Sequence, residues 1–97
     1  MDLYCEHGRM VNNRRSEIDI IHRILSLSSD GARKTEILYQ GNLSYTQLKS
    51  YLPFLLEKNI LEEYSTYNNG YSAKMYRTTD KGSELLTGIK KVLKYLE

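Results

Sequence analysis

The sequence RKTEILYQGNLSYTQLKSYLPFLLEKN, residues 33–59, contains two predicted helices separated by a very short turn. The first covers residues 33–39, and Gly41 then supplies a residue that tolerates a positive φ at a helix end. Ser44-Tyr45-Thr46-Gln47 matches the S-x-x-Q capping box, in which the serine and glutamine side chains each accept a backbone N–H from the other residue. A second helix is therefore predicted to begin at Ser44 and to end near Asn59.

The periodicity of this second helix leaves one face for packing and one for solvent. At about 100° per residue, Leu48, Leu52 and Leu55 fall within about 60° of arc, and Pro53 is expected to kink the helix. The polar side chains lie opposite this stripe or beside it: Thr46, Gln47, Lys49, Ser50 and Glu57. Two helices joined by a three- or four-residue turn with a glycine form a helix-turn-helix unit, whose second helix enters the major groove of DNA. Residues 44–58 are the predicted recognition helix.

Helices are also predicted on both sides of this unit. Upstream, Ser16 is a suitable N-cap, and the apolar residues from Ile18 to Leu27 cover about half of the helix circumference, which predicts a helix buried on two sides. Residues 28–31 end it. Downstream, residues 79–80 are expected to cap a last helix that extends to about residue 96.

Between these helices, two runs rich in Tyr, Thr and Ser (residues 62–67 and 71–78) flank Asn68-Asn69-Gly70. Asn-Gly between two strand-like runs is a strong signal for a β-hairpin. The expected fold is mainly α with a small β-hairpin, in the order helix, helix, helix, hairpin, helix. This is a winged helix-turn-helix, with residues 62–78 as the wing. The expected organisation has three parts: an N-terminal arm over 1–15, the winged helix-turn-helix domain over 16–82, and a C-terminal helix over 83–97.

Length and composition fit one small globular domain. The chain has 97 residues, of which 40% are hydrophobic and 27% charged. The formal net charge is only +2 and the pI is about 8.6. Since an obvious nucleic-acid-binding domain has a pI above about 9, the argument for DNA rests on where the cations lie and not on the total charge.

The sequence also predicts a compartment. No apolar stretch approaches the roughly 18 residues that a membrane span needs. Residues 1–15 have no apolar region of the kind found in secretory signals. A single cysteine, Cys5, cannot form an internal disulfide, which fits a reducing compartment. We therefore expect a cytoplasmic protein without a membrane partner.

Metal binding and catalysis are not predicted. Cys5, His7 and His22 do not have the number or the spacing of a structural zinc site. The sequence also lacks a G-x-S-x-G nucleophile motif and a phosphate-binding glycine loop. We expect no enzyme activity, no metal and no cofactor.

The candidate DNA contacts come from three segments. The recognition helix presents polar side chains and free N–H groups at its N-terminal end, which is the end that meets base edges and phosphates. The wing carries amides and cations suited to the sugar-phosphate backbone or the minor groove. Two further arginines lie in the N-terminal arm. The predicted contacts are Arg14, Arg15, Tyr45, Thr46, Gln47, Lys49, Ser50, Asn68, Asn69, Tyr71, Lys74 and Arg77.

The spacing of apolar residues in the last helix predicts a homodimer. Leu85, Ile89, Val92 and Leu96 follow a 4-3-4 spacing, which is typical of a coiled-coil seam. With Leu93, these residues form the predicted dimer interface. Two recognition helices in such a dimer address DNA half-sites about one helical turn apart.

Residues 18–86 resemble a known family. The fragments that carry the resemblance are Leu43-Ser44-Tyr45, Leu48, Tyr51, Leu55-Leu56-Glu57-Lys58-Asn59-Ile60 and Tyr76-x-Thr78-Thr79-x-Lys81-Gly82-x-x-Leu85-Leu86. In order and spacing they resemble the archaeal winged helix-turn-helix regulators that include the small Sulfolobus ten-kilodalton DNA-binding proteins. The resemblance implies dimers formed through the C-terminal helix and binding to double-stranded DNA, as a transcription regulator or a chromatin-like protein.

Two alternatives to a transcription regulator stay open at the level of sequence. Winged helices also serve as protein–protein interaction modules, which would use the hairpin or the last helix here. A non-specific, chromatin-like DNA-binding protein is the other alternative. The modest net charge favours a site-specific regulator over an abundant coating protein.

Overall fold

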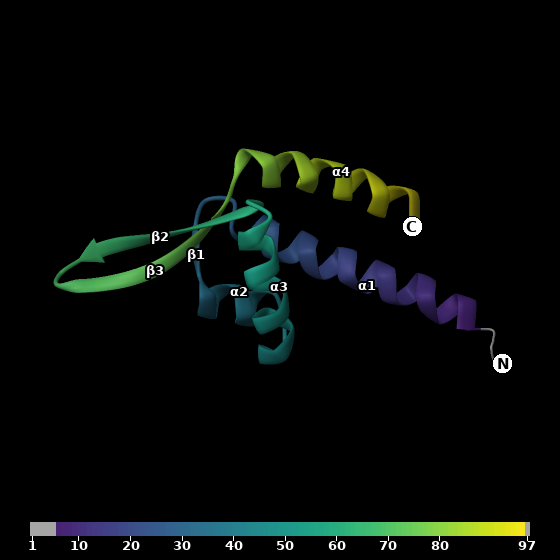
Figure 1. Cartoon of the computed structure of the whole chain (residues 1–97), viewed down its shortest axis with the longest axis horizontal. Coiled ribbons are helices and arrows are strands. Elements are labelled where there is room, and N and C mark those ends of the chain that lie inside the picture. Colours follow the sequence, from purple (N-terminus) through teal and green to yellow (C-terminus); the bar gives the residue numbers. More distant parts are fainter. Residues whose placement is uncertain (1–5, 97) are drawn as a thin grey trace.

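The computed structural model describes the backbone of residues 6–96 and the side chains of residues 17–67 and 69–95. Its elements follow the order helix, helix, helix, hairpin, helix, with one additional short strand (Figure 1). They are α1 (Glu6–Leu27), β1 (Ala32–Arg33), α2 (Lys34–Gln40), α3 (Tyr45–Glu57), β2 (Leu61–Asn68), β3 (Tyr71–Thr78) and α4 (Asp80–Leu96). The predicted winged helix-turn-helix architecture is confirmed.

α1 is longer than the sequence predicted. It begins at Glu6 instead of Ser16, so residues 6–15, expected as an arm, have a helical backbone. This segment contains no proline, and its weak helix formers, such as Gly8, Asn12 and Asn13, lower helix propensity without stopping the helix. The capping signal at Ser16 was misleading because serine is also tolerated inside a helix. Residues 1–5, the rest of the expected arm, lie outside the described residues.

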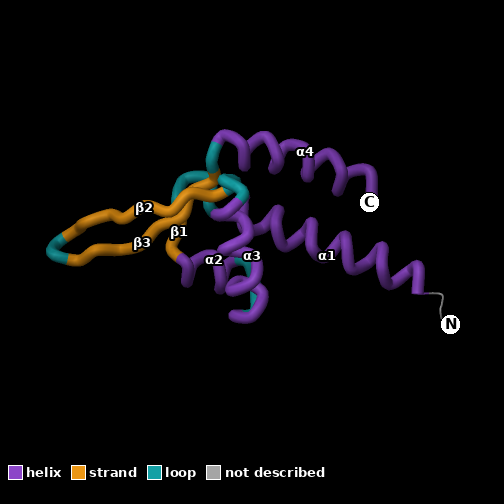
Figure 2. Tube along the Cα trace, viewed as in Figure 1, coloured by secondary structure: helices purple, strands orange, loops and turns teal. Residues whose placement is uncertain are grey.

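β1 is an element that the sequence did not predict, because two residues carry no periodicity. It forms one edge of an antiparallel sheet with the order β1-β3-β2. Ala32 pairs with Tyr76 and Arg33 with Met75, so β1 covers only the base of β3. Beyond that point β2 and β3 continue as a two-stranded ribbon, which is the wing (Figure 2).

The turn of the wing has the geometry that its residues predict. Asn68 pairs with Tyr71, which leaves a two-residue connection. Asn69 has a φ of 53° and Gly70 a φ of 85°. Positive φ at both central positions is the type I′ turn that matches the twist of two strands, and Asn-Gly is its preferred pair. The predicted hairpin is confirmed.

The core lies between the helices and the base of the sheet. α1 runs through its centre and buries Ile20, Ile24 and Leu25, which confirms a helix covered on two sides. α4 lies beside α1 and contributes Leu86 and Ile89 (Figure 1). The other buried apolar residues are Ala32, Ile37, Leu43, Leu48, Leu52, Leu55, Ile60, Leu61 and Tyr76. All four helices contribute residues to this core, so the position of α3 relative to the wing depends on the packing of all of them.

The start of α4 holds the base of the wing against the end of α3. Thr79 Oγ1 accepts the N–H of Gly82 at 3.0 Å and donates to the carbonyl of Asn59 at 2.7 Å. A Cβ on Gly82 would lie 2.2 Å from the Ile60 carbonyl oxygen, so only glycine allows this approach. Thr78 Oγ1 also donates to the Leu25 carbonyl at 2.7 Å, which attaches β3 to α1. The predicted cap at residues 79–80 is confirmed.

None of the helices within residues 6–96 has both the length and the apolarity that crossing a membrane requires.

Candidate nucleic-acid interface

The N-terminal end of α3 is held by the predicted capping box. Ser44 has an extended backbone, and its Oγ accepts the N–H of Gln47 at 3.1 Å. In return, Gln47 Oε1 accepts the N–H of Ser44 at 2.9 Å. Because the cap uses the carbonyl oxygen of Gln47, only the amide NH₂ of this side chain is free to contact a ligand.

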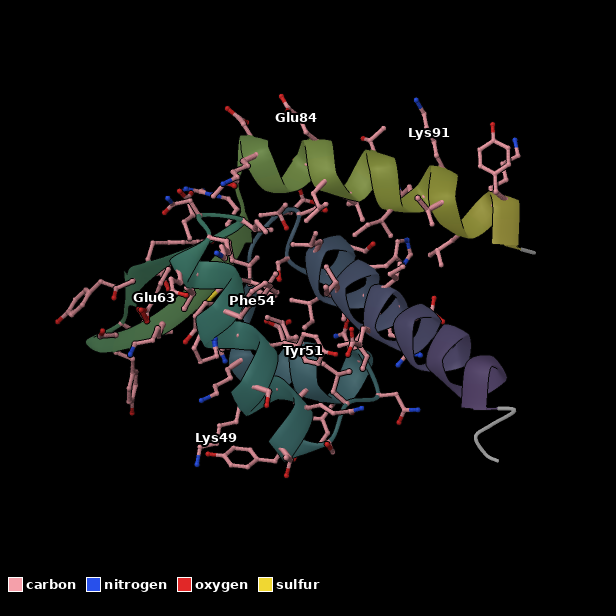
Figure 3. All side chains as sticks on the ribbon, turned by 45° about the vertical axis from the view of Figure 1, so that its right-hand side comes forward. Lys49, Tyr51, Phe54, Glu63, Glu84 and Lys91 are labelled. Atoms are coloured by element: carbon pink, nitrogen blue, oxygen red, sulfur yellow. The ribbon has the colours of Figure 1, made fainter. Side chains whose placement is uncertain are left out.

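The two faces of α3 separate as the periodicity predicted. Leu48, Leu52 and Leu55 are buried, and Figure 3 shows Lys49 pointing away from the body of the molecule. Tyr45 is 62% exposed. The predicted contacts Thr46, Gln47 and Ser50 are also exposed, and Ser50 lies on the side of α3 that faces α1. α3 continues through Pro53, which lies on the exposed face.

A basic concavity separates the start of α2 from the wing. Its volume is about 580 Å³, and β1, α2 and both strands of the wing contribute to its wall. The lining residues are Arg33, Lys34, Thr35, Thr66, Asn69, Tyr71, Ala73 and Lys74. Three of them are cations and the other five are neutral. The sequence predicted Asn69, Tyr71 and Lys74 as contacts, and the structure brings them together.

Arg33, Lys34, Thr35 and Thr66 were not predicted. They join the basic concavity because β1 pairs with β3, which places Arg33 opposite Met75 at the foot of the wing. No sequence motif marks a strand of two residues. A weaker signal was present, since Arg33 and Lys34 are adjacent cations at the start of a helix.

Ion pairs leave the cations of the basic concavity accessible. Lys74 Nζ lies 3.3 Å from a carboxylate oxygen of Glu63, but the Lys74 side chain is 65% exposed. Such exposed pairs contribute about 0–1 kcal/mol and are easily exchanged for a ligand. Lys34 Nζ lies 5.9 Å from the centre of the Tyr45 ring, so one cation of the basic concavity lies close to the first residue of α3.

The fold has counterparts among known proteins. The sequence profile of a family described as winged helix-turn-helix matches residues 14–97. The chain belongs to the winged helix-turn-helix family. No curated protein matches it by sequence.

Solved structures extend this result. The chain is similar to Sso10a-2, a DNA-binding protein from Sulfolobus solfataricus, with 26% identity and a TM-score of 0.68 over 80% of this chain and 78% of that one. A PadR family transcription regulator from Clostridium difficile R20291 has 23% identity and a TM-score of 0.70, over 81% of this chain and 88% of the regulator. A PadR family transcriptional regulator from Eggerthella lenta DSM 2243 has 20% identity and a TM-score of 0.70, over 92% of this chain and 83% of the regulator. The two regulators share the fold, and Sso10a-2 confirms the predicted resemblance.

Arg77 occupies a different part of this winged helix from the other predicted cations. Its Nε donates to Glu62 Oε1 at 2.8 Å, and its guanidinium lies 4.6 Å from the centre of the Tyr64 ring. The hydrogen bond and the charge of Glu62 raise the pKa of Arg77. Arg77 lines a second concavity with Asp80 and other residues at the start of α4. The structure therefore does not bring it into the basic concavity.

Arg14, Arg15 and Asn68 have described backbones, but their side chains lie outside the described residues. The two arginines belong to the part of α1 that extends away from the wing (Figure 1). Cys5 lies outside the described residues altogether.

The predicted dimer interface divides between two faces of α4. Ile89 is buried in the core of its own chain, and Leu93 packs against that core. Leu85 and Val92 are 37% and 44% exposed. Tyr95, also on α4, is 88% exposed. The side chain of Leu96 lies outside the described residues.

Proposed function

We propose that this winged helix binds double-stranded DNA as a transcription regulator, with α3 in the major groove and the wing on the adjoining backbone. The observation that carries the proposal is the basic concavity. A hollow with three cations and no acidic residue in its wall, placed between the start of α2 and the wing, fits a phosphodiester strand. The DNA-binding activity in the name of Sso10a-2 supports the same proposal.

Each part of the surface has a separate role. Tyr45, Thr46 and Lys49 project from the first two turns of α3, where side chains reach base edges. The side chains of Arg33, Lys34 and Lys74 neutralise phosphates of the strand in the basic concavity. Because phosphate contacts position the protein and base contacts specify the sequence, the concavity supplies affinity and α3 supplies specificity.

We further propose that a second copy of the chain covers the exposed face of α4, so that residues 83–97 act as a dimerisation element. Leu85, Val92 and Tyr95 project on that face. A Cβ on Gly88 would meet no atom within 4 Å, so a neighbouring helix has room to approach there. Two recognition helices would then address half-sites about 34 Å apart.

DNA binding is tested by the fluorescence anisotropy of a labelled random-sequence duplex, measured across a range of salt concentrations. We expect saturable binding whose log K falls linearly with log salt. Lys34→Ala is expected to weaken binding and to reduce that slope by about one unit, because it removes one phosphate contact. Lys90→Ala is the matched control, since Lys90 is exposed on α4, which lies across the molecule from Lys49 (Figure 3).

Two outcomes would overturn this assignment. Absence of saturable binding at low salt would remove the DNA-binding proposal. The exposed face of α4 would then favour a protein–protein interaction module, the second candidate. An equal loss of affinity in Lys34→Ala and Lys90→Ala would show that the basic concavity is not the site.

A further inference from the structure

We propose that Asn69, at the tip of the wing (residues 65–73), deamidates spontaneously, and that the carboxylate formed there weakens DNA binding by the basic concavity. The modification depends only on the chain itself, whereas its effect on DNA rests on the proposed function. Three observations carry the inference: the residue that follows Asn69, the position of that residue's N–H outside the strand ladder, and the place of Asn69 in the wall of the concavity.

Deamidation of an asparagine is an intramolecular attack by the backbone. The amide nitrogen of the next residue loses its proton to water and bonds to the side-chain carbon Cγ, while the side-chain nitrogen takes up a proton and leaves as ammonia. One water molecule then opens the five-membered imide at either carbonyl. The product is aspartate or isoaspartate, in which the chain continues through the former side chain. Either product replaces a neutral amide by a carboxylate.

Three asparagines share a left-handed backbone but precede different residues. The φ angle is 53° at Asn42, 61° at Asn59 and 53° at Asn69. Asn42 and Asn59 precede branched side chains that are buried in the core, whereas Asn69 precedes Gly70. A Cβ on Gly70 would meet no atom within 4 Å, so the space around its nitrogen is open. Crowding therefore opposes the attack at the first two sites and not at Asn69.

Hydrogen bonding distinguishes the same sites. The N–H groups that follow Asn42 and Asn59 donate to carbonyls in the last turns of α2 and α3, at 3.0 Å and 2.9 Å. The ladder of the wing ends at the pair of Asn68 and Tyr71, so the N–H of Gly70 lies outside it. Attack at the first two sites must break a bond that closes a helix, and attack at the tip of the wing does not.

The tip can also change its backbone conformation without disturbing the core. The turn must rotate until the Gly70 nitrogen meets Cγ of Asn69. The wing protrudes from the body of the molecule (Figure 1), and the flanking side chains of Tyr67 and Tyr71 are each 78% exposed. This rotation therefore changes only the end of the ribbon.

The basic concavity favours the reaction and gives its product an effect. Asn69 lines the concavity together with Arg33, Lys34 and Lys74. The carbonyl oxygen of the Asn69 side chain gains negative charge as the nitrogen adds, and neighbouring cations stabilise that charge. The product then places a carboxylate in a wall that has no acidic residue. It attracts the cations that would bind phosphates, and it repels the phosphates themselves.

The modification is tested on the full chain during incubation in mildly alkaline buffer. Peptide mapping by mass spectrometry measures the conversion of each asparagine to aspartate or isoaspartate. We expect Asn69 to convert at least about tenfold faster than Asn42 and Asn59, since one backbone hydrogen bond alone is worth up to about that factor. Asn42 and Asn59 are internal controls with the same backbone conformation.

The effect on DNA is tested by the anisotropy of a labelled duplex, with fresh and incubated protein. Fresh Asn69→Asp should bind about fivefold more weakly than the fresh wild type, which is the effect of one unit charge about 4 Å from a phosphate in water. The deficit should shrink as salt is added. Incubated wild type should approach the affinity of Asn69→Asp. Incubation should not change the affinity of Asn69→Gln, whose longer side chain would have to close a six-membered ring.

Each failure has its own signature. If Asn69 converts no faster than Asn42 and Asn59, the modification site is wrong. If Asn69 converts but both Asn69→Asp and the incubated wild type bind as tightly as fresh wild type, the effect on DNA is wrong and the proposed function stands. If the fresh wild type binds no duplex, the proposed function is wrong, and the effect on DNA with it.

Discussion

The recognition helix and the wing are the two parts of the proposed DNA-binding surface, but they are held in place by different means. α3 is fixed by three buried leucines and by a reciprocal capping box. The outer half of the wing is held only by the ladder between β2 and β3, because β1 pairs with β3 only at Met75 and Tyr76. The helix therefore contributes to the stability of the domain through the face opposite its proposed DNA contacts. The wing tip is free to vary, since its side chains contact nothing that the fold requires.

The largest effect should come from a matched pair of truncations in the two regions. Leu48→Ala removes a side chain that is 1% exposed and should lower the free energy of unfolding by about 2–5 kcal/mol. Tyr67→Ala should change it by less than about 0.5 kcal/mol, since the ring is 78% exposed. Urea denaturation followed by circular dichroism measures both. A similar loss in the two variants would show that the tip packs against the body.

An intermediate effect is expected at Pro53, inside α3. Proline lacks the N–H that would bond the carbonyl of Lys49. Pro53→Ala should therefore raise the free energy of unfolding by about 1–3 kcal/mol, because alanine is the strongest helix former and the site is exposed. Thermal unfolding measures the gain. No gain would mean that the carbonyl of Lys49 is equally well satisfied without the helical bond, so that α3 is less regular than its buried face suggests.

The smallest effect is a pH dependence at the base of the wing. Burial raises the pKa of Tyr76 above the ordinary value of 10.0, with Glu63 adding to the rise and Lys74 opposing it. The folded state disfavours the tyrosinate, so stability is unchanged below about pH 10 and falls as the pH rises through the pKa of the folded state. Tyr76→Phe should reduce this fall.

The measurement is the urea midpoint between pH 8 and pH 11.5, compared between Tyr76→Phe and the wild type. Tyr51, whose pKa is also raised by burial and by Glu17, should leave a residual alkaline dependence in the variant. An identical pH profile for both proteins would mean that the hydroxyl of Tyr76 is in water. The base of the wing would then be less buried than the structure indicates, and the contrast in burial between the base and the exposed tip would be weaker.

Local signals predicted most of the elements. The capping box at Ser44, the Asn69-Gly70 turn and the cap at Thr79 are each satisfied within a few residues, so each was visible in the sequence. The start of α1 was not visible, because residues 6–15 contain neither a stop signal nor an apolar period. β1 escaped prediction because its two residues become a strand only by pairing with β3.

The candidate site was predicted only in part, for a related reason. Exposed polar residues of α3 follow from its periodicity, so Thr46 and Lys49 were identified. Arg33 and Lys34 were not, since they join the wing through a pairing between residues more than forty positions apart. Arg77 looked equivalent to Lys74 in the sequence, but a cross-strand partner, Glu62, occupies its guanidinium.

The sequence by itself determined the order of the elements, the cap of the recognition helix and the turn of the wing, because these depend on hydrogen bonds and backbone preferences among neighbours. Tertiary structure alone decided the basic concavity and the division of α4, where Ile89 is buried and Val92 exposed. A helical period shows which residues share a stripe. The apolar stripe of α4 is wide, and the neighbouring helix α1 decides which side of it is buried. The sequence of α4 alone does not show where α1 makes that contact.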